Sequence, residues 1–451
     1  MLKTIEIQEA KNLVVHGRNG VRRQPLTLFW TASGLEMNLH GSEIWVEFES
    51  DFSLYEQWIS VILNGAHIAR FPLQKGRIWM PVLRGLDAQK THHIEIIRDV
   101  QAMPTDPDCS LRVHALRYDG ELLPVAEKKL RLEVIGDSLT SSEGAIGAKT
   151  ETDWIAPFFC AAHGYPYLLG QKLNADLRVI SQSGWGALTS WDNDPHCAMP
   201  LYYDQVCGVL KGEKNAALGA FEPNDFEAWN ADVVVVNLGA NDSSAFEQGP
   251  WTDPETGVVY KQRKNEDGTR NAEDVQKLSD AMLNFLIKIR KHNPHAYLIW
   301  VHGMFCNTLT EVVTNMVEEY KRTTGDARVE AFRMPELPAS GVGARNHPGL
   351  PMHEVAAQAL AGNLEKLMKN GAEMAQTAIS WRDRMDTTSY RYGAFSKSLG
   401  ARDWGVTVTE NDRIISLVTC ADNDTDVRFV VQAKLVSSKD RTTGKITNYG
   451  G

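Results

Sequence analysis

The chain has 451 residues, a length that predicts two or three domains of about 150 residues each. Hydrophobic residues make up 43%, as in a globular protein, and 47 basic against 57 acidic residues give a net charge of -10. Because no basic block could neutralise a row of phosphates, we expect no nucleic-acid partner. The sequence shows neither a secretory signal nor an apolar run of roughly 20 residues, so we expect a soluble cytoplasmic protein with no membrane partner.

The six cysteines show neither a CxxC pair nor a metal-ligand spacing. This pattern is typical of reduced thiols in a reducing compartment. We therefore expect no metal and no cofactor.

Residues 1–125 are predicted to form a β-sandwich or jelly-roll domain. The dipeptide Asn64-Gly65 stands between two apolar segments and is a strong hairpin signal. Regular short strands without helical spacing indicate two packed sheets. Three segments that alternate apolar and polar residues and are rich in β-branched and aromatic side chains are 43–49, 58–63 and 93–97.

Residues 126–371 show a different pattern, in which apolar runs alternate with amphipathic helices. The clearest helix begins near Asn271, and the last runs from His353 to about Lys369, where Asn370-Gly371 predicts a C-terminal cap. Such alternation predicts an α/β fold with a mostly parallel sheet covered by helices on both faces. The expected strands are residues 132–135, 177–180, 233–236, 297–301 and 327–331.

The first of these strands runs directly into the sequence GDSL, which places Ser138 at the carboxyl end of a buried strand. Sites in parallel sheets lie beyond the carboxyl ends of the strands, and a turn eased by glycine would hold a hydroxyl rigidly there. Ser138 is therefore the candidate nucleophile. The alternative is an ordinary strand-to-loop turn in which this serine is only a helix cap.

The next two strands also end in hydrogen-bond donors. The second ends in SQSGWG, which closes with Gly186, and the third ends in NLGAND, which contains Asn241. Together with the backbone N–H of Ser138, the Gly186 N–H and the Asn241 amide would form an oxyanion hole. In the alternative, Gly184 and Gly186 are simple turn glycines and the Asn-Asp pair caps a helix.

His347 is the candidate base, because imidazole titrates near working pH and can take the serine proton and return it to the leaving alcohol. It stands in the sequence RNHPGLPMH just before the last helix, so a loop brings it to the edge of the sheet. His353 is interpreted as the start of that helix.

Taken together, these blocks resemble the GDSL/SGNH hydrolases over roughly residues 130–370. The resemblance implies a flavodoxin-like three-layer domain with Ser138 as nucleophile, His347 as base, and oxyanion-hole donors from Ser138, Gly186 and Asn241. With a β domain in front, the chain is also similar to carbohydrate esterase family 2, whose members pair a jelly roll with such a domain and deacetylate plant polysaccharide fragments. The matching blocks are GDSL at 136–139, Gly186, GAND at 239–242, and His347-Pro348.

One position departs from the family pattern. Its members commonly carry an aspartate two or three residues before the histidine, where this chain has Arg345 and Ala344. Three interpretations stay open: a Ser-His dyad whose imidazole is held by a backbone carbonyl, which we favour; an acid from another loop; or impaired catalysis, which would leave a carbohydrate-binding protein.

Three tryptophans are candidate substrate contacts: Trp185, Trp191 and Trp154. Aromatic faces at the rim of a site suit the apolar faces of sugar rings, although tryptophan is also an ordinary core residue. The charged segment 247–270 is expected to be a loop that could cover the site. We therefore expect a serine esterase that removes acetyl groups from O-acetylated oligosaccharides, with another small acyl ester, a lipid or a thioester as the alternative substrate. The sequence leaves the oligomeric state open.

Residues 372–451 are β-rich, and the stretch from Trp404 to Val436 resembles the last strands of a class B sortase. The resemblance implies a thiol nucleophile at Cys420 and a carbonyl-stabilising arginine at Arg428. No histidine follows His353, and the segment is too short to close a barrel, so we expect a partial sortase-like segment without transpeptidase activity. In the alternative, Cys420 is a buried small residue on a strand.

Overall fold

The computed structural model describes residues 1–304, 307–385, 414–420, 428–434, 437–439 and 446–448. The chain divides into two compact units, Met1–Asn363 and Leu364–Gly451. Within the described ranges, no helix combines the length and the apolar character needed to cross a bilayer.

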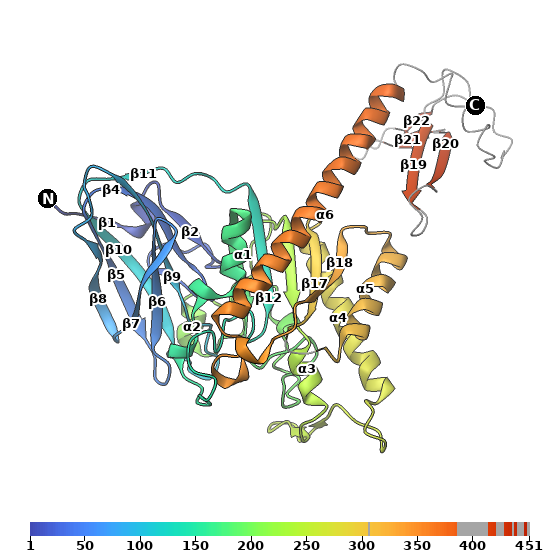
Figure 1. Ribbon diagram of the computed structural model, residues 1–451, viewed down its shortest axis with the longest axis horizontal. Coiled ribbons are helices and arrows are strands. Elements are labelled where there is room, and N and C mark those ends of the chain that lie inside the picture. Colours follow the sequence, from blue (N-terminus) through green and yellow to red (C-terminus); the bar gives the residue numbers. More distant parts are fainter. Residues whose placement is uncertain (305–306, 386–413, 421–427, 435–436, 440–445, 449–451) are drawn as a thin grey trace. The chain divides into compact units, whose positions relative to one another are not determined.

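The first unit begins with a β-sandwich of two antiparallel sheets (Figure 1). Its strands are β1 (Lys3–Glu6), β2 (Val14–His16), β3 (Leu26–Thr27), β4 (Gly34–His40), β5 (Glu43–Asp51), β6 (Gln57–Leu63), β7 (Ala66–Leu73), β8 (Gly76–Arg84), β9 (Thr91–Arg98), β10 (Ser110–Tyr118) and β11 (Glu121–Leu123). One sheet has the order β1-β10-β5-β8 with β3 beside β10, and the other has the order β11-β4-β9-β6-β7 with β2 beside β4.

Alternate residues of each strand fill the core between the two sheets. On β5, for example, Ile44, Val46 and Phe48 are fully buried. The hairpin predicted at Asn64-Gly65 joins β6 to β7, and both residues have positive φ, 51° and 81°, as a two-residue type I′ turn requires.

A parallel sheet follows the sandwich in the same unit. Its strands are β12 (Leu130–Gly136), β13 (Ala175–Ser181), β14 (Val233–Asn237), β17 (Tyr297–Gly303) and β18 (Val329–Met334). All pairings are parallel and the order is β13-β12-β14-β17-β18, the 2-1-3-4-5 order of flavodoxin-like sheets. The predicted α/β fold is confirmed, and the carboxyl ends of β12, β13 and β14 lie side by side.

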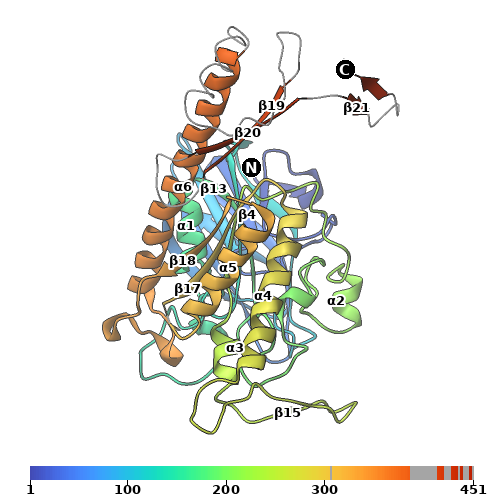
Figure 2. The same cartoon turned by 90° about the vertical axis from the view of Figure 1, so that its right-hand side faces the viewer.

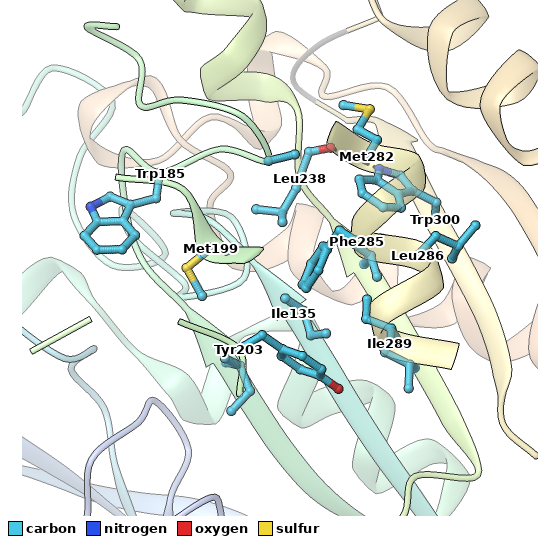
Figure 3. Close-up of a cluster of buried hydrophobic side chains, with 14 of the residues drawn as sticks. Ile135, Trp185, Met199, Tyr203, Leu238, Met282, Phe285, Leu286, Ile289 and Trp300 are labelled. Carbon is cyan, nitrogen blue, oxygen red and sulfur yellow. Dashed lines mark hydrogen bonds between the residues drawn. The ribbon is translucent and has the colours of Figure 1, made fainter. Parts of the chain in front are cut away.

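Helices cover both faces of this sheet. The helices of the chain's described part are α1 (Tyr165–Leu173), α2 (Glu213–Ala217), α3 (Ala240–Ala245), α4 (Ala272–His292), α5 (Thr310–Thr324) and α6 (Leu350–Met385). α4 and α5 cover one face, and α1 with the beginning of α6 covers the other (Figures 1 and 2). On the first face, Phe285 and Leu286 of α4 pack with Trp300 of β17 in the largest buried cluster (Figure 3).

The ends of two helices test the sequence signals. α4 begins as predicted, because the Asn271 side chain accepts hydrogen bonds from the backbone N–H groups of Glu273 and Asp274. The predicted end at Asn370-Gly371 is wrong, since α6 continues to Met385. A glycine inside a helix costs about 1 kcal/mol relative to alanine, and the strong helix formers that follow it, AEMAQ, offset that cost.

The second unit contains two antiparallel strand pairs after α6. They are β19 (Ile414–Cys420) with β20 (Arg428–Lys434), and β21 (Ser437–Lys439) with β22 (Ile446–Asn448). Cys420 and Arg428 are direct partners in the register of β19 and β20. Trp404 and the rest of the predicted sortase-like segment before Ile414 lie outside the described residues. The sortase-like assignment stays a prediction, as do the domain boundaries near residues 125 and 371.

Candidate active site

Ser138 lies directly after β12, between the ends of β13 and β14. Gly136 has to be a glycine, because a Cβ there would lie 2.0 Å from Thr140 Oγ1. The backbone N–H groups of Thr140 and Ser141 both donate to Asp137 O, at 3.1 and 2.9 Å, and close a tight turn. Ser138 is only 8% exposed, so the turn holds its hydroxyl in a fixed position.

His347 meets this hydroxyl from the loop before α6. Its Nε2 lies 2.8 Å from Ser138 Oγ, and its Nδ1 lies 2.9 Å from the backbone oxygen of Arg345. Because Nδ1–H donates to that carbonyl, Nε2 is left to accept the serine proton. Two residues that are 209 positions apart in the chain are therefore in hydrogen-bonding contact.

Glu143 approaches the imidazole from the turn of residues 137–143, which carries the predicted nucleophile Ser138 and is called the nucleophile turn below. Glu143 was not identified from the sequence. Its Oε1 lies 4.0 Å from His347 Nδ1, beyond hydrogen-bonding distance, and accepts from Arg345 Nε at 2.7 Å. Arg345 has a left-handed backbone with φ 56°, and its N–H and Nη1 donate to the carbonyls of Glu151 and Thr152. The arrangement therefore combines two of the predicted alternatives. The backbone carbonyl of Arg345 contacts the His347 ring, and the Glu143 carboxylate, from another turn, holds the side chain of Arg345.

Asn241, on α3, lies beside the nucleophile turn. Its Nδ2 donates to Trp185 O at 2.9 Å and to Asp137 Oδ2 at 3.2 Å. Burial raises the pKa of Asp137 to about 7, and the carboxylates of Asp242 and Glu143 add to this effect. A carboxyl that is neutral in part of the molecules near pH 7 is a weaker acceptor, so the longer of the two bonds is the easier one to exchange for a bond to a substrate oxyanion.

Gly186 and Gly184 lie in different surroundings. The Gly186 N–H donates to Cys197 O at 3.4 Å, and this glycine does not line the cavity described below. A Cβ at Gly186 would lie 2.3 Å from Asp242 Oδ2, the carboxylate that accepts the backbone N–H groups of residues 187–189. Gly184 does line the cavity, with φ 81°, and within the described part of the chain its N–H has no acceptor. Gly184, which the sequence analysis did not name as a donor, is thus the glycine beside the cavity, and its place nearer to the end of β13 is the signal that was available.

Ser138 and His347 line a cavity of about 530 Å³, which all three predicted tryptophans also line. Trp191 is 48% exposed and offers a face to solvent. Trp185 is 7% exposed and packs into the main core. Trp154 packs edge-on against Tyr55 of the sandwich, with ring centroids 4.8 Å apart. Trp191 is therefore the most exposed of the three tryptophans, whereas Trp185 is largely a core residue.

One wall of the cavity comes from the sandwich and was not anticipated. Met103, Pro104 and Thr105 lie in the loop between β9 and β10 and line the cavity. No local pattern marks a loop of one β region as the wall of a site formed by another region, so the sequence held no signal for it.

The charged segment 247–270, expected as a covering loop, contributes only Gln248 to the cavity lining. It contains a two-stranded hairpin, β15 (Trp251–Thr252) with β16 (Val259–Tyr260). Arg263 fastens its end to α4 through an ion pair with Asp274 at 2.7 Å. The segment is therefore an anchored hairpin that reaches the site at one residue.

No protein-family model matches the chain. The cellulase/esterase CelE of Acetivibrio thermocellus is 25% identical over 349 residues, 74% of this chain, and the chain spans 37% of that protein's length.

Two solved structures are similar over most of the first unit. An acetyl xylan esterase from the rumen bacterium Butyrivibrio proteoclasticus is 38% identical, with a TM-score of 0.80 over 82% of this chain and 99% of the esterase. A family two carbohydrate esterase from Clostridium thermocellum, in complex with cellohexaose, is 20% identical and shares the fold, with a TM-score of 0.65 over 79% and 99% of the two chains.

The sandwich, the doubly wound sheet and the serine-histidine pair at its carboxyl edge define the class as a hydrolase of the GDSL/SGNH type. The acetyl xylan esterase is 38% identical and is matched over 99% of its length, which identifies the family as well as the class. The chain belongs to carbohydrate esterase family 2, a family of carboxylic ester hydrolases.

Proposed function

We propose that this protein removes acetyl groups from O-acetylated oligosaccharides. The observation that carries the proposal is the 2.8 Å contact between Ser138 Oγ and His347 Nε2 at the edge of an open cavity. The similarity to an acetyl xylan esterase supports acetyl as the acyl group. The cavity of about 530 Å³ is larger than an acetyl group requires and leaves room for a sugar beside it.

In the proposed reaction, His347 Nε2 takes the proton of Ser138 as its Oγ attacks the ester carbonyl carbon. The tetrahedral intermediate collapses when the imidazolium gives this proton to the departing sugar oxygen, which leaves an acetyl-serine. A water molecule, deprotonated by the same imidazole, then attacks the acetyl-serine, and acetate departs while Ser138 regains its proton. The carbonyl of Arg345 keeps the ring in the tautomer that both steps need.

The oxyanion of the intermediate would be bound by the backbone N–H of Ser138 and the Asn241 amide. The third donor predicted from the sequence is the Gly186 N–H. We favour the Gly184 N–H as the third donor instead, because Gly184 lies in the cavity wall and Gly186 does not. The sugar would pack against the exposed face of Trp191, with the Met103–Thr105 wall as the neighbouring surface.

Substitution of the nucleophile tests the proposal. Ser138→Ala should lower the release of 4-nitrophenol from its acetate, and of acetate from acetylated xylo-oligosaccharides, by at least about a thousandfold. Ser141→Ala is the matched control, because Ser141 lies in the same turn as Ser138 but its hydroxyl donates to Ser181 Oγ, at the end of β13, at 2.9 Å. The control should lose at most about tenfold, the value of one neutral hydrogen bond.

The length of the acyl chain separates the proposal from the lipase and thioesterase alternatives. Acetyl esters should react faster than butyryl esters and far faster than octanoyl esters. Turnover by Ser138→Ala at the wild-type rate would refute the serine mechanism, and a preference for octanoyl esters would refute the acetyl assignment.

A further inference from the structure

Two histidines and a cysteine gather where β7, an edge strand of the sandwich, meets the segment just before α1. His67 belongs to β7, whereas Cys160 and His163 stand in the short turn that precedes α1. One nitrogen of each imidazole and the Sγ of Cys160 all lie within 4.8 Å of one another. The three residues are separate from those that line the active-site cavity.

The hydrogen bonds of this cluster point a lone pair inward. His67 Nε2 lies 3.1 Å from Ala69 O and donates to it, so His67 Nδ1 is unprotonated. That nitrogen faces His163 Nε2 at 2.9 Å. Metal-binding histidines commonly donate their second ring N–H to a backbone carbonyl, which fixes the tautomer and the orientation of the ring. His67 already has this arrangement.

We propose that His67, Cys160 and His163 bind a divalent transition-metal ion, with zinc as the best match, and that a water molecule completes the coordination. Thiolate and imidazole are the ligands that zinc prefers, and three protein ligands with one water form a tetrahedral site. The sequence shows no metal-ligand spacing because the ligands come from two distant segments. His67 and His163 are 96 positions apart in the chain.

The geometry is close to that of a bound state. Tetrahedral coordination at zinc bond lengths sets the ligand atoms roughly 3.3 to 3.7 Å apart. The two nitrogens must therefore separate by a few tenths of an ångström, and the widest separation in the cluster must shorten by about 1 Å. Both imidazoles are only partly buried, so rotation of these side chains can supply the movement.

Binding changes the protonation of two ligands. The Cys160 thiol loses its proton to solvent, and His163 carries its ring proton on Nδ1 so that Nε2 can bind the metal. Burial raises the pKa of Cys160 to about 12, with a further rise from the Asp99 carboxylate and an opposing effect of Arg70. The nearby Asp99 carboxylate is already paired with Arg70 at 2.5 Å. The Cys160 thiolate is therefore the anion that would balance the charge of the metal.

The bound metal would join the sandwich to the nucleophile turn. The backbone N–H of Cys160 donates to Ser142 O at 3.4 Å. Gly164 packs so closely on the same residue that a Cβ there would lie 1.8 Å from Ser142 Oγ. The site would therefore stabilise the turn that carries Ser138, without touching the substrate.

Zinc titration of the full chain tests this site after removal of bound metal with a chelator. Wild-type protein should bind one equivalent of Zn²⁺ and unfold at a higher temperature with Zn²⁺ than without it. Cys160→Ser, His67→Gln and His163→Gln should each weaken Zn²⁺ binding by at least about tenfold and abolish the thermal shift. Cys197→Ser and His196→Gln, whose side chains lie outside the cluster, are the matched controls and should bind as the wild type does.

Co²⁺ gives a second test that needs no substitution. Wild-type protein loaded with Co²⁺ should show a thiolate-to-cobalt charge-transfer band, so the ligand set stays testable even if Cys160→Ser fails to fold. The site is refuted if Zn²⁺ neither binds nor shifts the unfolding temperature, if the three substitutions leave binding unchanged, or if Co²⁺ binds without the thiolate band.

Discussion

Two histidines of the first unit show what surroundings do to the same side chain. His347, at the edge of the parallel sheet, contacts the Ser138 hydroxyl and the backbone oxygen of Arg345. His16, on β2 of the sandwich, lies between two carboxylates, with Nδ1 2.8 Å from Asp176 of β13 and Nε2 2.5 Å from Glu36. The hydrogen bonds of the first ring are to neutral groups, with the Glu143 carboxylate farther away at 4.0 Å from Nδ1, whereas the second ring has a carboxylate within hydrogen-bonding distance of each nitrogen.

The consequence of this difference is a division of roles. Burial alone would lower the pKa of His16, but hydrogen bonds to Asp176 and Glu36 outweigh it and raise the pKa to about 9. His16 is therefore a cation at neutral pH and holds the sandwich to the parallel sheet. A carbonyl and a hydroxyl are the hydrogen-bond partners of His347, and its Nε2 lies beside the hydroxyl whose proton it would take and return. Substitution of His347 should therefore change the rate of the reaction, and substitution of His16 should change the stability of the fold.

The largest effect is expected at the catalytic ring. His347→Gln should lower kcat for 4-nitrophenyl acetate by about a thousandfold or more, because no group remains to take the serine proton. Its free energy of unfolding in urea should change by less than about 1 kcal/mol, since Glu143 keeps its closer ion pair with Arg345, at 2.7 Å, when the ring is lost. A variant that keeps a tenth of the wild-type rate would contradict the role of His347 as base.

The reverse result is expected at the sandwich. A rise of the His16 pKa from 6.5 to about 9 corresponds to about 3 kcal/mol of stability. Because the pKa is raised in the folded state, this stability is fully present below about pH 6.5 and is lost as the pH rises through about 9. His16→Gln should therefore lower the free energy of unfolding by about 3 kcal/mol near pH 6 and by much less above pH 9, with unchanged kcat for the folded protein.

Urea titrations of His16→Gln across this pH range provide the measurement. His196→Gln is a suitable control, because that side chain is mostly exposed, although it also faces two carboxylates, Asp194 at 3.0 Å and Asp253 at 4.0 Å. A stability loss that is the same at pH 6 and pH 9 would show that the His16 ring acts by packing and not by charge.

A smaller effect should follow the loss of the Asn241 amide. Asn241→Ala should lower kcat about a hundredfold with little change in KM, as expected for a donor that strengthens its bond only in the transition state. Steady-state kinetics on an acetylated xylo-oligosaccharide would show this split. A rise in KM at constant kcat would instead assign Asn241 to substrate binding.

The smallest effect is expected at Glu143, which acts on His347 through Arg345. Glu143→Gln removes the charge that holds the guanidinium at 2.7 Å, while Arg345 keeps its bonds to the carbonyls of Glu151 and Thr152. We expect a fall in kcat of about tenfold, roughly the value of one charged hydrogen bond. Glu151→Gln is the matched control, since Arg345 contacts only the backbone of that residue. Equal kcat values for the two variants would show that Glu143 does not position His347 through Arg345.

The parts of this protein that sequence could predict are those with a local cause. The strands of the parallel sheet are short segments rich in apolar residues, and each predicted segment overlaps an observed strand. Asn64-Gly65 dictates a tight turn by its own backbone preferences, and Asn271 caps a helix with its own side chain. Ser138 and His347 could be paired because strand ends and the loop before the last helix meet at one edge of such a sheet.

The parts that sequence could not predict depend on which distant loops meet. Glu143 reaches Arg345 only because Arg345 takes a left-handed conformation across from the nucleophile turn. The Met103–Thr105 wall depends on how the sandwich packs on the sheet. Gly184 and Gly186 are chemically alike, and only their neighbours decide which one lines the cavity.

The central claim is that His347 activates Ser138, and the rate of covalent trapping by a fluorophosphonate tests it most directly. Only an activated serine reacts quickly with such a probe. We expect one equivalent of label per chain, located on Ser138 by mass spectrometry, and a labelling rate that falls at least about a hundredfold in His347→Gln. Label on a different residue, or equal labelling rates for the two proteins, would contradict it.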